Sequence, residues 1–153
     1  AGTLLPALHV GIFALSTRLL LLLTALFLTP SPTSQAQDAL FPSETHGTPV
    51  HKTMTSLCWG NVLSENRDEI VWTSFTSDIS AEQLIEAYKT KVGDVGLKVE
   101  KGAADWSFAS DPARHLTITP VKDYKPHGSC DKQPPQKAKS VAEISAFYRR
   151  SKK

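Results

Sequence analysis

The chain has 153 residues, of which 41% are hydrophobic and 21% are charged, and its formal net charge at pH 7 is +2. These fractions are ordinary for a globular domain and exclude collagen-like, coiled-coil and fully disordered proteins. The length allows one domain with tails. The small net charge produces no field that would attract nucleic acid, so we predict no nucleic-acid partner.

The N-terminal region has the parts of a secretory signal peptide. An apolar stretch, LLLLLTALFL at residues 19–28, follows Arg18, and the tripeptide SQA at residues 34–36 places small residues three and one positions before a cleavage site. A basic residue, an apolar core and a small-x-small site together predict export. We therefore expect residues 1–36 to be an N-terminal extension plus a signal peptide that is cleaved near Ala36.

The alternative is an uncleaved N-terminal helix that anchors the chain in a membrane. A spanning helix needs about 20 apolar residues, and residues 4–28 reach that length only by including His9 and Arg18. An arginine at the bilayer centre costs about 2.5–3.5 kcal/mol, which favours cleavage over anchoring. Met54 is the only methionine, and a misassigned start would explain both this and the extra residues 1–17.

The two cysteines, Cys58 and Cys130, both follow the expected cleavage site. In an oxidising compartment, an even pair with no third thiol predicts one disulfide. The two positions are 72 residues apart. Closing a loop of this length stabilises the folded state by about 4 kcal/mol in the chain-entropy model.

The rest of the chain divides into three parts. Residues 37–50 are polar and interrupted by Pro42, Gly47 and Pro49, so we expect a flexible leader. Residues 51–148 carry the apolar periodicity of a single folded domain. Residues 149–153 (RRSKK) form a basic tail.

One helix is predicted with both of its ends defined. Ser80 and Gln83 fit a capping box, in which each side chain satisfies a backbone N–H of the other residue. Gly93 suits the position after the last turn. A continuous apolar face over residues 80–92 is formed by Ala81, Leu84, Ile85, Tyr88 and Val92.

β-prone residues and two-residue alternation predict strands over residues 53–63, 69–76, 97–100, 105–109 and 114–119. Residues 140–148 (SVAEISAFY) fit a helix by a Ser-x-x-Glu capping box, but also alternate as a strand; we favour the strand because it gives the sheet a closing partner. The expected fold is therefore α+β: an antiparallel sheet of five or six strands with one amphipathic helix packed on one face.

The residue types of the chain offer candidate ligands for a metal site. His127 and Cys130, with His46, His51 and His115 elsewhere, offer ligands that suit zinc or copper. A disulfide would remove both thiolates, so we predict no metal and no cofactor, with His115 and His127 as the candidate ligands if a metal is bound.

Catalysis has little support in the sequence. The chain has no Gly-x-Ser-x-Gly elbow, no Gly-rich phosphate loop and no His-Glu-x-x-His motif. Cys58 lies in an apolar strand segment, which disfavours the thiolate that a nucleophile needs. We expect at least two of the tryptophans Trp59, Trp72 and Trp106 to lie in the core, which argues against a stacking platform.

Residues 75–88 (FTSDISAEQLIEAY) resemble a strand-to-helix pattern in many small exported bacterial proteins. The resemblance covers only this short pattern, identifies no family and carries no function over to this chain. We expect a small, non-catalytic binding or envelope-associated domain of unknown partner, with its site on the sheet face left uncovered by the helix or on the loop at 122–139. The basic tail offers a contact to an anionic surface. The alternatives are a small metal-dependent or hydrolytic enzyme using His115 and His127, and a structural subunit of an envelope assembly.

Overall fold

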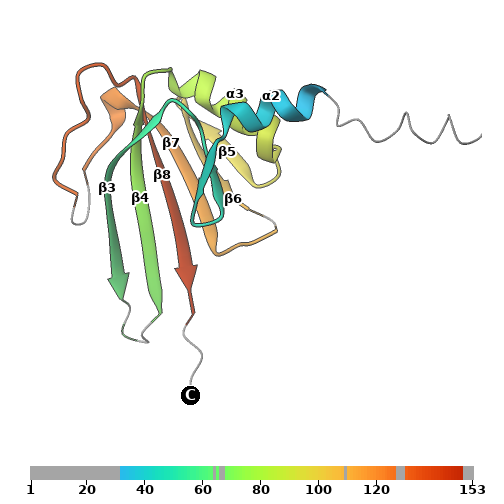
Figure 1. The fold of residues 1–153 in the computed structure, drawn as a ribbon. Helices are drawn as coiled ribbons and strands as arrows, with labels where there is room; N and C mark the ends of the chain where they lie inside the picture. Colours follow the sequence, from blue (N-terminus) through green and yellow to red (C-terminus); the bar gives the residue numbers. More distant parts are fainter. Residues whose placement is uncertain (1–31, 64, 66–67, 109, 127–129, 150–153) are drawn as a thin grey trace, which may run out of the picture. The chain divides into compact units, whose positions relative to one another are not determined.

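The computed structural model describes residues 32–63, 65, 68–108, 110–126 and 130–149. These residues form an α+β fold with a six-stranded antiparallel sheet, a two-stranded hairpin and one main helix, as the sequence predicted (Figure 1). The order of the large sheet is β3-β4-β8-β7-β6-β5. Its strands are β3 Met54–Leu63, β4 Glu69–Ser77, β5 Leu97–Glu100, β6 Ala103–Ser107, β7 Arg114–Pro120 and β8 Ser140–Tyr148.

The ambiguous segment at 140–148 is a strand, and it lies in the middle of the sheet. β8 pairs with β4 along its whole length and with β7 on its other side (Figure 1). This position satisfies the backbone groups of β8 on both edges, which outweighs the local capping box that favoured a helix. The strand expected at 105–109 begins earlier, because the turn before β6 contains only Lys101 and Gly102, both at positive φ.

The predicted helix is α3, Ala81–Val92, and the capping box is present. The Gln83 backbone N–H donates to Ser80 Oγ at 3.3 Å, and the Ser80 N–H donates to Gln83 Oε1 at 3.1 Å. α3 lies over β6 and β7. The buried helix residues Ala81, Leu84, Ile85 and Tyr88 join one core cluster with sheet residues that include Phe75, Ala104, Trp106, Leu116, Ile118, Ala142 and Ile144.

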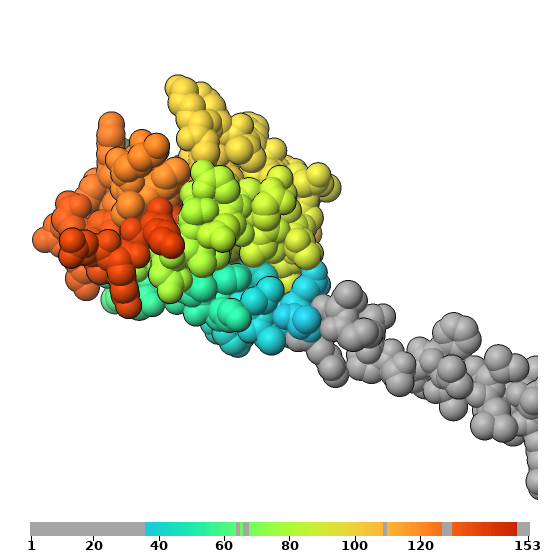
Figure 2. Space-filling view, turned by 90° about the horizontal axis from the view of Figure 1, so that it is seen from above, coloured from blue at the N-terminus to red at the C-terminus, as the bar shows by residue number. Residues whose placement is uncertain are grey.

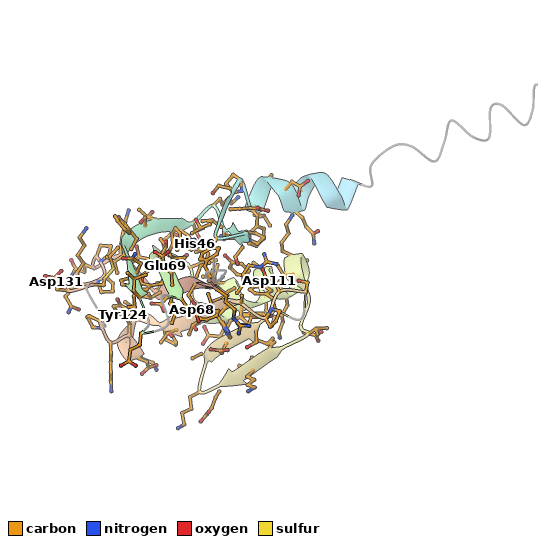
Figure 3. All side chains as sticks on the ribbon, turned by 90° about the horizontal axis from the view of Figure 1, so that it is seen from below. His46, Asp68, Glu69, Asp111, Tyr124 and Asp131 are labelled. Carbon is orange, nitrogen blue, oxygen red and sulfur yellow. A yellow bond between two sulfur atoms is a disulfide. The ribbon has the colours of Figure 1, made fainter. Side chains whose placement is uncertain are left out.

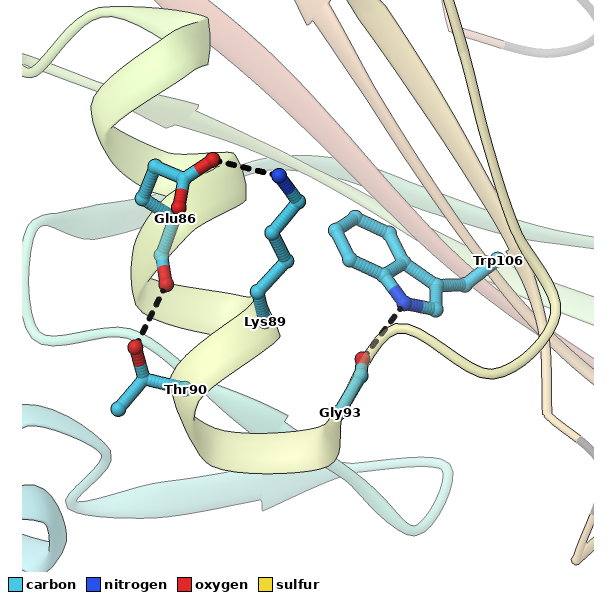
Figure 4. A network of polar contacts seen from close by, with 5 residues as sticks. All are labelled: Glu86, Lys89, Thr90, Gly93 and Trp106. Atoms are coloured by element: carbon cyan, nitrogen blue, oxygen red, sulfur yellow. Dashed lines mark hydrogen bonds and ion pairs between the residues drawn. The ribbon is translucent and has the colours of Figure 1, made fainter.

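Trp106 connects the end of α3 to the sheet. Its side chain is fully buried, and its indole N–H donates to the Gly93 carbonyl oxygen at 3.1 Å (Figure 4). The last turn carries its own polar contacts, with Lys89 Nζ 2.6 Å from Glu86 Oε1 and Thr90 Oγ1 donating to the Glu86 carbonyl at 2.9 Å. Trp106 therefore fixes the position at which the chain leaves the helix.

Residues 37–50, which the sequence predicted to be a flexible leader, contain regular structure. Helix α2 (Pro32–Leu40) is followed by a hairpin of β1 (Ser43–Thr45) and β2 (Thr48–Val50). Phe41 and Val50 belong to the buried core, and the Phe41 ring lies 5.1 Å from the ring of Tyr88. The Tyr88 hydroxyl donates to the Pro49 carbonyl at 2.6 Å.

This N-terminal segment packs against α3. Gln37 donates to the Thr90 carbonyl at 3.1 Å, and Lys91 pairs with Asp38 at 2.8 Å. The part of α2 that contains Gln37 and Asp38 therefore lies alongside α3 (Figure 2). The polar residues and prolines that predicted flexibility instead form the hairpin and its turn. The folded core thus starts before residue 51, where the sequence placed its boundary. Contacts divide the chain into two compact units, residues 1–35 and 36–153.

Two glycines provide a matched test of backbone packing. Gly93 and Gly96 have φ of 81° and 79°, but a Cβ at Gly96 would lie 2.0 Å from the Ser107 carbonyl oxygen, whereas a Cβ at Gly93 would meet nothing within 4 Å. Gly93→Ala should lower the free energy of unfolding by about 1–2 kcal/mol through positive φ alone. Gly96→Ala should lower it by clearly more, measured by urea unfolding. Equal losses would contradict the close approach of Gly96 to β6.

Two histidines predict acid sensitivity of the fold. Burial lowers the pKa of His46, and burial followed by repulsion from Lys52 lowers the pKa of His51, which Asp78 partly opposes. His51 Nδ1 accepts the Thr53 backbone N–H at 3.3 Å, an interaction that protonation of Nδ1 would remove.

Because both folded-state pKa values lie below the unfolded value of about 6.5, the unfolded chain binds more protons in this range. The contribution of the two neutral histidines to the free energy of unfolding is fully present above a pH of about 6.5. It is lost as the pH falls through the folded-state pKa values. The variant His46→Asn/His51→Asn should therefore lose stability less steeply between pH 7 and pH 5 in thermal unfolding. If the double variant is already less stable than the natural protein at pH 8, where both histidines are neutral, that part of the loss comes from packing and not from titration.

Candidate functional site

The face of the sheet opposite α3 is the candidate site, and we call it the open face. Strand register places its side chains in rows that cross β4, β8 and β7. One row contains Ser74, Glu143 and Thr117, and the next contains Trp72, Ser145 and His115. Apart from Trp72, these two rows therefore carry polar and titratable groups, whereas the other face of the sheet carries the core.

The disulfide predicted from the sequence is present and joins the open face to a loop. Cys58 of β3 and Cys130 are bonded, with their Cα atoms 5.9 Å apart. Cys130 is buried and belongs to the long connection between the 3-10 helix η2 (Val121–Asp123) and β8. Further along this connection, the Lys139 backbone N–H donates to the Ser77 carbonyl at 2.8 Å. The bond thus holds this connection against the sheet at the β3 side.

Tyr124 of the same connection lies over the polar row. Its hydroxyl is 3.8 Å from Cys130 Sγ, and Ser74 Oγ donates to Glu143 Oε2 at 3.2 Å. Burial raises the pKa of Tyr124, the charge of Glu143 raises it further, and a hydrogen bond with Ser74 opposes both effects. The phenol therefore stays protonated at neutral pH. A cavity of about 200 Å³ lies beside Tyr124, Glu143 and Thr117.

A larger hollow occupies the other end of the open face. Its volume is about 670 Å³, which falls within the range of small-molecule sites. Apolar side chains supply most of its walls, and three polar residues complete them: the lining residues are Ile70, Pro112, Ala113, Ala146 and Phe147, with His115, Ser145 and Arg149. The hollow therefore offers an apolar surface with a guanidinium group beside it.

The described histidines among the candidate metal ligands lie on different faces of the sheet. His115 faces the hollow with Nδ1 3.3 Å from Ser107 Oγ, whereas His46 contacts Thr73 and His51 packs on Phe41, both on the helix side. His127 lies outside the described residues. Among the side chains that the structure describes, no three His, Cys, Asp or Glu residues form a group that could hold a metal ion.

The cavity beside Tyr124 and the large hollow are lined by different residues. In the view from below, Tyr124 and Asp131 lie at one side of the molecule, and Asp111, in the connection between β6 and β7, lies at the other (Figure 3). Arg114 pairs with Asp111 at 3.0 Å and also donates to the Gly47 carbonyl, so this acid is already partnered. The Tyr124 cluster and the large hollow are therefore two separate features of one face.

Sequence reasoning named the open face but missed the hollow. Ile70 and Phe147 are apolar residues at strand positions that alternate with the core-facing set, and that mismatch was the available signal. Arg149 was recognised only as part of a basic tail. Trp72 and Trp106 are buried as expected, and Trp59 is exposed.

Comparison with known proteins finds no matching family model, no matching curated protein and no matching solved structure. In the described part of the chain, no helix combines the length and the apolar composition needed to cross a membrane. The function is therefore argued from the geometry of the open face.

Loss of the disulfide should release the connection from the sheet and destabilise the fold. The chain-entropy model gives about 4 kcal/mol for closing a loop of 72 residues. We expect Cys58→Ser/Cys130→Ser to show a clearly lower Tm and faster amide exchange around Tyr124. Dithiothreitol should lower the Tm of the natural protein and leave that of the double variant unchanged. An unchanged Tm for the natural protein after verified reduction would contradict this role of the bond.

Proposed function

We propose that the protein is an exported, non-catalytic domain that binds a small ligand in the large hollow of the open face. The single observation that carries this proposal is a hollow of about 670 Å³ whose walls are mostly apolar and which no element of the described fold fills. Ile70 is 43% exposed there. Apolar surface left open in a concave site of this size is typical of ligand pockets.

The lining residues favour an amphipathic anion. Ile70, Phe147 and Pro112 provide contacts for an apolar body, and the Arg149 guanidinium provides a fixed positive charge for a carboxylate or a similar group. Ser145 and His115 add hydrogen-bonding groups to the lining. A medium-chain carboxylate combines these properties.

Export is part of the proposal and rests on three observations. The N-terminal sequence has a basic residue, an apolar core and a small-x-small site. The boundary between the two compact units falls between Gln35 and Ala36, next to the expected cleavage site. The intramolecular disulfide is compatible with an oxidising compartment outside the cytosol. An envelope-associated role in a bacterium is consistent with these observations.

Binding is tested with the protein produced from the full chain in an exporting bacterial host, where its mass also reports cleavage near Ala36. The fluorescent probe is 1-anilinonaphthalene-8-sulfonate, which has an aromatic body and one negative charge, and decanoate is the competitor. We expect saturable probe binding that decanoate displaces. Phe147→Asp should weaken the affinities for the probe and for decanoate by at least about tenfold, equivalent to 1.4 kcal/mol, because it places a carboxylate in the apolar wall.

Two controls separate this site from general surface binding. Val99→Asp introduces the same charge at an exposed position on β5, and it should leave affinity unchanged. Arg149→Gln should weaken displacement by decanoate more than displacement by decanol, which has the same chain without a charge. Equal affinity in the natural protein and Phe147→Asp, with both folded, would exclude the hollow as the binding site.

A further inference from the structure

The outer edge of β3 is open along a strand of ten residues. β3 is the terminal strand of the large sheet and pairs only with β4 in the described structure. Its sequence, MTSLCWGNVL, contains no charged residue and no proline. Proteins usually protect an exposed edge with charge, proline or a very short strand, because free N–H and C=O groups attract another strand.

The opposite edge of the sheet shows that protection. β5 has only four residues, and two of them, Lys98 and Glu100, are charged. A β-bulge also protects an edge strand, and β3 has one between Ser56 and Cys58. The regular, unprotected part of the edge therefore runs from Cys58 to Leu63.

Apolar side chains stand exposed on both faces of this part of β3. Trp59 is 75% exposed and Leu63 is 60% exposed on the helix side, as their pairing with Thr73 and Glu69 shows. Val62, which is 55% exposed, pairs with Ile70 and faces the other side. A rigid partner lying on one face would leave the other face uncovered. An added strand covers both, because its own side chains alternate between the two faces.

We propose that β3 is the interface for a second copy of this chain, which adds its own β3 in antiparallel orientation about a two-fold axis at Asn61. In this register Trp59 lies opposite Leu63 of the partner subunit, so each copy contributes one aromatic and one aliphatic residue to two equivalent pairs. Aromatic–aliphatic pairs opposite one another are favourable in antiparallel sheets.

The same register is also compatible with the side chains on the other face of β3 and with the absence of charge on this strand. Gly60 lies opposite Val62 of the partner subunit and leaves space for its side chain. Because Met54–Leu63 carries no charge, two identical edges meet without like-charge repulsion. The result is one continuous antiparallel sheet across a closed, isologous dimer.

The size of this contact sets the expected affinity. Stable interfaces bury about 800 Å² on each partner, and a pairing restricted to residues 59–63 is smaller than that. We therefore expect a weak dimer, with a dissociation constant of about 10–500 μM, which corresponds to the low end of specific affinities.

Sedimentation equilibrium between about 5 μM and 1 mM, a range that brackets the expected dissociation constant, tests the proposal on protein produced from the full chain in an exporting host. The natural protein should pass from monomer to dimer. Leu63→Lys should remain monomeric, because it removes the aliphatic member of both cross-strand pairs and places a charged residue on each paired edge. Val99→Lys is the matched control, with the same change at a residue 54% exposed on the opposite edge strand, and it should dimerise like the natural protein.

The register is tested by a cysteine at the proposed two-fold axis. Residues that face each other in an antiparallel pair have Cα atoms about 4.5–5.5 Å apart, which lies within the range that a disulfide spans. Asn61→Cys should therefore form dimers linked between the two introduced cysteines, with Cys58–Cys130 intact by peptide mapping, whereas Val99→Cys should not. A monomer throughout the range, assembly beyond a dimer, dimerisation that Leu63→Lys leaves unchanged, or no link through Asn61→Cys would overturn the proposal.

Discussion

The fold is governed by the fact that one short helix must serve a wide sheet. α3 has 12 residues and is about 18 Å long, while six strands span about 24 Å across and the ten residues of β3 extend about 33 Å. The helix therefore covers β6 and β7, and the remaining helix-side surface needs other elements. Phe41, Val50 and the hairpin of β1 and β2 provide them, and Tyr88 joins both parts through its ring and its hydroxyl.

Among the residues that the structure describes, no α-helix packs on the open face, and a covalent bond helps to hold the connection that covers part of it. Small domains bury a limited fraction of their surface, and a disulfide compensates by restricting the unfolded chain. The Cys58–Cys130 bond holds the connection that contains Tyr124 against the polar row of β4, β8 and β7. The bond is at the β3 side, so the surface around Ile70, Phe147 and His115 stays open as a hollow.

The two proposed binding surfaces have the same structural origin but use different groups. Both arise where β3, β4 and β8 extend beyond the elements that cover the sheet. The hollow is concave and offers side chains, including one guanidinium, which suits a small amphipathic anion. The β3 edge offers backbone hydrogen-bonding groups with apolar residues on both faces, which suits another strand. Because the hollow is lined from β4, β7, β8 and the connection before β7, pairing at β3 would leave it accessible.

The sequence alone determined the elements whose signals lie within a few residues of each other. Ser80 and Gln83 define the start of α3, three- and four-residue spacing defines its apolar face, and alternation defines most of the strands. The disulfide also followed from the sequence, because two cysteines allow only one pairing. Tertiary structure alone decided that residues 37–50 belong to the core, that 140–148 is a central strand, and that Ile70, Phe147 and Arg149 line one hollow. In each of these cases the deciding contacts join residues far apart in the chain, such as Phe41 with Tyr88 or Ile70 with Phe147. Local propensity and periodicity carry no information about such partners, because burial and strand pairing depend on which distant segment arrives beside them.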